Sequence, residues 1–135
     1  MRNYLEQLRY VEQLLNVKYS SVNIQMRNDM STSAQIEITV ASGKTYKFWV
    51  HSDGYPRGVI PRLIDTDELE ELRRALGTED LYDAFPSYFY EIDLKQKTIV
   101  IYDSVYSDDN TKKLKGELIF SGTFDEVKSA YGNQS

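Results

Sequence analysis

Apolar and polar residues recur with two different periods along this chain, and the periods separate its expected helices from its expected strands. In residues 3–16 apolar side chains return every three to four positions, as on one side of an amphipathic helix. Asn3 followed by Glu6 fits the capping box that begins such a helix. We therefore expect an N-terminal helix packed on one face of a sheet.

Strict alternation of apolar and polar residues predicts strands with one buried face and one wet face. It predicts three strands at residues 22–27, 34–40 and 46–51, and three more are expected at residues 88–93, 98–104 and 114–121. Turn-forming residues separate neighbouring segments, and Ser42-Gly43 suits a tight hairpin. Because the links are short, each group of three is expected to form a meander.

The turn Asp53-Gly54-Tyr55-Pro56 follows the third strand and is expected to be a rigid corner. Asp can bond the backbone ahead of it, Gly permits positive φ, and Pro fixes φ and holds Tyr55 extended. After the corner, residues 59–64 are expected to add one or two helical turns, with Pro61 near their start.

Two further helices are expected, each with its own capping residues. The first begins at Asp65 with Glu68 as its capping partner, carries an apolar stripe through residues 69–76, and ends at Gly77. Residues 78–85 are expected to form a short helix or a loop, anchored by Tyr82 and Phe85.

The second is a C-terminal helix over residues 123–131, capped by Thr123 with Glu126. Runs of strands and runs of helices are thus segregated along the chain, which favours α+β over βαβ organisation. We expect one domain, residues 1–135, with an antiparallel sheet of five to six strands covered by N-terminal, central and C-terminal helices.

Composition narrows the possible functions. The 135 residues include no Cys, which excludes a disulfide framework, a zinc finger and a thiol nucleophile. No apolar run is long enough to span a bilayer, and the N-terminus has no secretory pattern, so a cytoplasmic protein is expected. The net charge of −5 argues against nucleic-acid binding and suits a protein partner. The 11 Tyr suit half-exposed sheet faces or a binding surface.

Catalytic and metal-binding patterns are sparse. His51 is the only His, and its neighbours Ser52 and Asp53 would point to opposite faces of a strand, which is a poor geometry for a Ser-His-Asp triad. The acidic loop at residues 103–109 lacks the ligand spacing of a calcium loop, and no phosphate-binding Gly motif with its Lys is present. We therefore expect no cofactor and no metal, and we lean against an enzyme.

The corner nevertheless gathers rare residues that could bind a ligand or partner. Trp49, His51 and Tyr55 are expected to share the face of the strand that points away from the core, and two Arg residues follow at once. Aromatic rings beside Arg are typical of recognition surfaces and of pockets for small anions. The candidate binding residues are therefore Trp49, His51, Asp53, Tyr55, Arg57 and Arg62.

Two motifs in the middle of the chain resemble a motif pair found in short uncharacterised proteins of bacteria, phages and mobile elements. The pair is His-x-Asp-Gly-Tyr-Pro-x-Gly and, later, Tyr-x-Tyr-x-Ile-Asp-Leu, and many such proteins have Trp where Ser52 stands here. The resemblance singles out the Asp-Gly-Tyr-Pro corner, but these proteins have no established activity, so it implies no role for the corner. The matching residues are His51, Asp53, Gly54, Tyr55, Pro56, Gly58, Tyr88, Tyr90, Ile92, Asp93 and Leu94.

The leading hypothesis is a small, acidic, non-enzymatic binding protein that contacts a protein partner through a Tyr-rich surface. The resemblance to phage proteins makes an inhibitor of a host or defence protein a natural form of it. The alternative is a protein or enzyme that binds a nucleotide or another small anion around the Asp-Gly-Tyr-Pro turn. A homo-oligomer formed through an unpaired edge strand is a third hypothesis.

Overall fold

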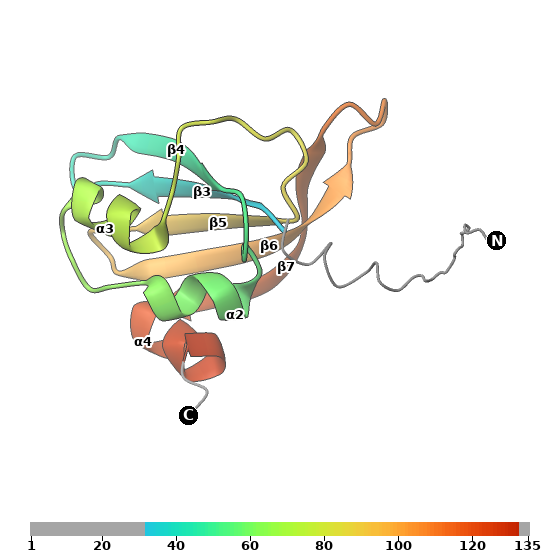
Figure 1. The fold of residues 1–135 in the computed structure, drawn as a ribbon. Coiled ribbons are helices and arrows are strands. Elements are labelled where there is room, and N and C mark those ends of the chain that lie inside the picture. Colours follow the sequence, from blue (N-terminus) through green and yellow to red (C-terminus); the bar gives the residue numbers. More distant parts are fainter. Residues whose placement is uncertain (1–31, 133–135) are drawn as a thin grey trace. The chain divides into compact units, whose positions relative to one another are not determined.

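The computed structural model describes residues 32–132, and the described residues from Ser33 onward belong to one compact unit (Figure 1). The helix expected at residues 3–16 and the strand expected at residues 22–27 lie outside the described residues. The expectation of one domain spanning residues 1–135 therefore stays a prediction.

The described strands form one sheet of five, in the order β4-β3-β5-β6-β7. All neighbouring pairs are antiparallel except β3 and β5, which run parallel. This confirms the α+β class and corrects the expectation of a purely antiparallel sheet. The strands are β3 (Ala34–Thr39), β4 (Thr45–Val50), β5 (Tyr88–Asp93), β6 (Thr98–Tyr106) and β7 (Lys113–Thr123).

The parallel pairing follows from the long link between β4 and β5. Residues 51–87 hold the central helices, and a link of that length can carry the chain past β3 to its far side. The short links behave as expected. Gly43 has φ 94° and donates to the Val40 carbonyl at 2.8 Å in the β3–β4 hairpin.

The first described helix begins earlier than expected. Pro56 starts α2 (Pro56–Val59), which continues as the 3-10 turn η1 (Ile60–Arg62). Tyr55 precedes it with φ −73° and ψ 160°, the extended geometry expected before Pro. Pro is favoured at the first helical position because its fixed φ suits the helix and its missing N–H is not needed there.

The second helix, α3 (Leu69–Leu76), begins later than expected. Glu68 precedes its first turn and makes no side-chain cap, so the predicted capping role of Asp65 is wrong. The Asp65 carboxylate instead lies 2.8 Å from the Lys97 amine. The far end is as predicted, because Gly77 terminates α3 in the left-handed conformation with φ 71°.

The C-terminal helix has the predicted capping box. The Thr123 hydroxyl accepts from the Glu126 amide at 3.1 Å, and the Glu126 carboxylate accepts from the Thr123 amide at 2.8 Å. Four α-helical residues, α4 (Phe124–Val127), lead into the π-helical turn η2 (Lys128–Gly132). Phe124 and Val127 are buried, so this short segment is held by its cap and its apolar side.

The core lies between the helices and one face of the sheet (Figure 1). Ala34, Ile36 and Ile38 on β3 are fully buried, and the same alternation buries the matching residues of the other central strands. Leu72 and Leu76 of α3 belong to the same cluster. Among the described residues, no helix is long and apolar enough to cross a membrane. We refer below to the two sides of the sheet as the helix face and the opposite face.

Candidate functional site

The corner is tight for a reason other than the one expected. Asp53, not Gly54, adopts positive φ, at 55°, which Asp tolerates better than most residues. Gly54 is needed because a Cβ there would lie 2.7 Å from the Ser33 carbonyl carbon and 2.9 Å from the Ala34 nitrogen. The corner is therefore pressed directly against the backbone at the start of β3.

A buried hydrogen bond fixes the corner to the centre of the sheet. The Tyr90 hydroxyl on β5 donates to the Gly54 carbonyl at 2.7 Å, and Tyr90 is 1% exposed. Burial raises the pKa of the Tyr90 phenol far above its ordinary value, and the nearby Tyr88 and Tyr131 act in the same direction. The phenol therefore stays protonated and keeps its hydrogen to donate.

The predicted binding residues do not form one cluster. Trp49 alternates with the buried Phe48 and Val50, so its side chain points to the opposite face. Tyr55, by contrast, lies beyond the turn beside Arg57 and α2, on the helix face. The expectation that Trp49, His51 and Tyr55 share one face is therefore wrong, because the strand's alternation ends before Asp53 redirects the chain.

Asp53 and Arg62 hold the corner internally. One Arg62 nitrogen donates to the Leu76 carbonyl at 3.0 Å, at the C-terminal end of α3, and the other lies 3.8 Å from the Asp53 carboxylate. The same carboxylate accepts from the Tyr55 hydroxyl at 3.3 Å. Arg62 thus joins the turn to α3 and satisfies a helix-terminal carbonyl.

Tyr55 and Arg57 line an open groove on the helix face, with a volume of about 400 Å³. Tyr88 and Tyr131 are partly buried and pack against the core, so the core supports their side chains where they line the groove. The Arg57 guanidinium carbon lies 5.8 Å from the centre of the Tyr131 ring. We call this hollow the Tyr groove, and its lining residues are Tyr55, Pro56, Arg57, Tyr88, Ile119 and Tyr131.

Sequence reasoning did not assign Tyr88, Ile119 and Tyr131 to the site. The sequence does contain a feature that points to Tyr88, because Tyr88 belongs to the second motif of the resemblance. No sequence feature points to Ile119, because irregularities in the β6–β7 register at Tyr102 alter which residues of β7 face which side of the sheet. Tyr131 was expected to point inward, and it is half-buried at the edge of the core.

Trp49 and His51 lie instead beneath the 78–87 loop, which passes along the edge of β4. Glu79 exchanges two backbone hydrogen bonds with Trp49, at 2.9 and 2.7 Å, and covers part of that edge. The Tyr82 ring stands edge-on to the Trp49 ring, with centroids 5.4 Å apart. Tyr82 and Phe85, the residues expected to anchor this segment, are 61% and 45% exposed and contact the Trp49 and Tyr106 rings from the surface.

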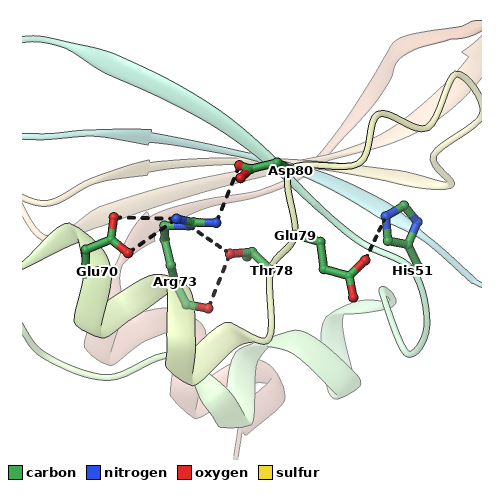
Figure 2. Close-up of polar contacts among 6 residues, drawn as sticks. All are labelled: His51, Glu70, Arg73, Thr78, Glu79 and Asp80. Atoms are coloured by element: carbon green, nitrogen blue, oxygen red, sulfur yellow. Dashed lines mark hydrogen bonds and ion pairs between the residues drawn. The ribbon is translucent and has the colours of Figure 1, made fainter.

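Side chains of His51 and Arg73 contact polar residues along the first half of the loop (Figure 2). His51 faces two acids, with Nε2 3.5 Å from Glu79 and Nδ1 3.9 Å from Asp83. Arg73 on α3 lies 3.5 Å from Asp80 and bonds Thr78, while its guanidinium carbon lies 4.1 Å from the centre of the Phe48 ring. Sequence patterns gave no sign of these pairings.

Catalytic geometry around His51 is lacking within the part of the chain described. No hydroxyl hydrogen-bonds to His51, and its Nε2 is buried without a hydrogen-bond partner there, as is Nε1 of Trp49. No group of three His, Asp or Glu side chains converges as a metal site requires within residues 32–132. The arrangement is suited to holding a loop in place.

Comparisons with protein-family models, with curated proteins and with solved structures found no match. The resemblance of the motif pair therefore stays a prediction. The two motifs do meet in space, because Tyr90 of the second bonds Gly54 of the first. Tyr88 of the second and Tyr55 of the first also line the same groove.

Proposed function

We propose that this protein is a small non-enzymatic binding protein that holds an extended segment of a partner protein in the Tyr groove. One observation carries the proposal: three Tyr rings, a Pro, an Ile and an Arg line a single open hollow of about 400 Å³. Tyr and Arg dominate the energetics of protein interfaces, and Tyr supplies contact area at a low entropic cost.

The lining indicates what such a segment would present. Apolar side chains would lie against the rings of Tyr55, Tyr88 and Tyr131, because these rings offer flat apolar surface with polar tips. Arg57 would donate to a backbone carbonyl or a carboxylate of the segment. The resemblance to phage proteins favours a host or defence protein as the partner, and inhibition as the outcome.

The experiment is a selection of random displayed peptides on the full chain, followed by affinity measurement with purified peptides. Arg57→Ala should weaken the selected peptides about tenfold, since one hydrogen bond to a charged group contributes about 1.5–3 kcal/mol. Arg74→Ala is the matched control, because Arg74 is an exposed Arg on α3 outside the groove. Peptides that bind both variants as tightly as wild type would remove the groove from consideration.

The alternative function is the binding of a small anion at the turn. It requires a positively charged side chain there that can contact the anion. Arg62 and Asp53 are engaged with each other and with neighbouring groups, so Arg57 is the cation that faces the Tyr groove. A thermal-shift screen with nucleotides and divalent metals tests this alternative. Stabilisation that disappears in both His51→Ala and Arg57→Ala would favour it over the peptide-binding function.

A further inference from the structure

A second hollow lies on the opposite face of the sheet and differs from the Tyr groove in chemistry. Its volume is about 480 Å³, within the range of small-molecule sites. Its walls come from β3 and β4, from the 78–87 loop, and from the end of the β6–β7 hairpin. We call it the Lys concavity, after Lys47, Lys112, Lys113 and Lys115.

The β6–β7 hairpin curls over the opposite face to form one wall. Lys115 on β7 contacts Glu91 on β5 and lies 3.9 Å from Glu37 on β3, although β7 and β3 are three places apart in the sheet. In a flat sheet those strands would be about 14 Å apart, since neighbouring strands are about 4.8 Å apart. The hairpin end extends beyond the other strands in Figure 1.

The 78–87 loop closes the neighbouring side. The Lys113 amide donates to the Ala84 carbonyl at 2.8 Å, and the Phe85 and Tyr106 rings lie 6.3 Å apart. Tyr82 lines the hollow from this loop. The loop and hairpin therefore meet, and together they make a concave surface out of an otherwise open sheet face.

The charge of the concavity is opposite to that of the whole chain. Its lining carries four Lys and one Glu, whereas the chain has a net charge of −5. Glu37 lies 3.9 Å from both Lys47 and Lys115, and so partly balances those two amines. Burial acts to lower the pKa of Lys115, but the contact with Glu91 and the charge of Glu37 raise it overall.

In the described part of the chain, the Lys112 and Lys113 amines are not balanced by a carboxylate in this way. Within residues 32–132 neither amine has a carboxylate at ion-pair distance, and the Lys113 amine lies 4.9 Å from the centre of the Tyr106 ring. The nearby Asp109 carboxylate accepts from the hydroxyls of Thr111 and Ser107, which lower its pKa to about 2. Two Lys residues without an ion pair among the described residues thus line a hollow of ligand size.

We propose that the Lys concavity binds a compact organic polyphosphate of nucleotide size. Its phosphates would lie on Lys112 and Lys113, because Lys amines bind phosphate as mobile point charges. Its organic part would lie against Tyr82. This site is separate from the Tyr groove and does not depend on the function proposed for it.

The test is isothermal titration of the full chain with ATP, pyrophosphate and citrate, without metal and at one ionic strength. ATP should bind saturably and more tightly than pyrophosphate, because Tyr82 adds contact with the organic part. Fluorescence of Trp49, the only Trp, gives a second readout because it touches Tyr82. Replacing Lys112 and Lys113 together by Gln should weaken ATP about tenfold or more.

The control is the double replacement of Lys44 and Lys95 by Gln, which changes the net charge equally at two exposed sites outside the hollow. It should change ATP affinity by about twofold or less, as expected for remote surface charges. Equal losses in both double variants, or no saturable heat with ATP and pyrophosphate, would overturn the proposal. So would binding of citrate or a Glu-rich peptide in place of the phosphates. Arg57→Ala should leave ATP binding unchanged, which separates this site from the groove.

Discussion

The Tyr groove and the Lys concavity lie on opposite faces of one sheet and depend on the fold in different ways. The groove is continuous with the core, because Tyr88 and Tyr131 pack against buried residues and Tyr55 lies beside the corner. The concavity is made where a loop meets a curled hairpin; ion pairs hold Lys47 and Lys115, and Lys113 contacts a Tyr ring. Changes at the corner or in the half-buried Tyr residues of the groove should therefore alter both stability and binding, whereas changes to the exposed Arg57 or to the lysines should alter binding alone.

The largest expected effect is that of Gly54→Ala, on the groove side. Its Cβ would meet Ser33 and Ala34 backbone atoms that cannot give way as a side chain would. We expect a loss of about 3 kcal/mol in the free energy of unfolding, measured by urea denaturation. Gly43→Ala is the control: its Cβ meets nothing within 4 Å, and only its positive φ should cost about 1–2 kcal/mol. A smaller loss at position 54 than at position 43 would contradict the tight corner.

Tyr90→Phe should have the next largest effect. It removes the donor to the Gly54 carbonyl and leaves a buried acceptor unsatisfied, at a cost of about 1–3 kcal/mol. The wild-type bond should also confer a pH dependence. Because the folded pKa of Tyr90 is raised above 10.0, its stabilisation is complete below pH 10 and declines as pH rises further. Urea denaturation across that range should show a shallower decline for Tyr90→Phe than for Tyr106→Phe, a surface control.

Tyr82→Ala tests the concavity side. Loss of the edge-on contact with Trp49 should cost about 0.5–1.5 kcal/mol and shift the fluorescence of the only Trp to longer wavelength. Peptide binding in the groove should not change. Leu81→Ala, at the adjacent exposed position, should leave the emission spectrum as it is. An unchanged spectrum in Tyr82→Ala would show that the loop does not cover Trp49 in solution.

Arg57→Ala should have the smallest effect on stability, within about 0.5 kcal/mol, because Arg57 is exposed and its ring contact with Tyr131 is at the surface. Thermal unfolding beside Arg74→Ala measures this. A loss of more than about 2 kcal/mol would mean that the groove's Arg is part of the fold and not a binding residue.

Local features of the sequence predicted most of the described elements. Alternation in residues 34–40 and 46–51 identified β3 and β4, because a half-buried sheet imposes it. The Thr123 and Glu126 pair predicted the cap of α4, and Gly77 predicted the end of α3, because both signals act within a few residues.

Features that depend on distant residues could not be predicted in this way. The parallel β3–β5 pair depends on the route of residues 51–87, which no local pattern encodes. The separation of Trp49 from Tyr55 depends on positive φ at Asp53, and the curl that places Lys115 beside Glu37 depends on the irregular β6–β7 register. Both hollows are therefore tertiary features.

The parallel β3–β5 pair has a consequence for the rate of folding. On either side of it, the β3–β4 hairpin and the β5–β6–β7 meander are built from strands close in sequence. Such local pairs can close quickly, whereas joining β3 to β5 requires ordering the long intervening segment first. We therefore infer that formation of the β3–β5 pair sets the height of the folding barrier. The β3–β4 hairpin and the β5–β6–β7 meander would each form native contacts before that pair does.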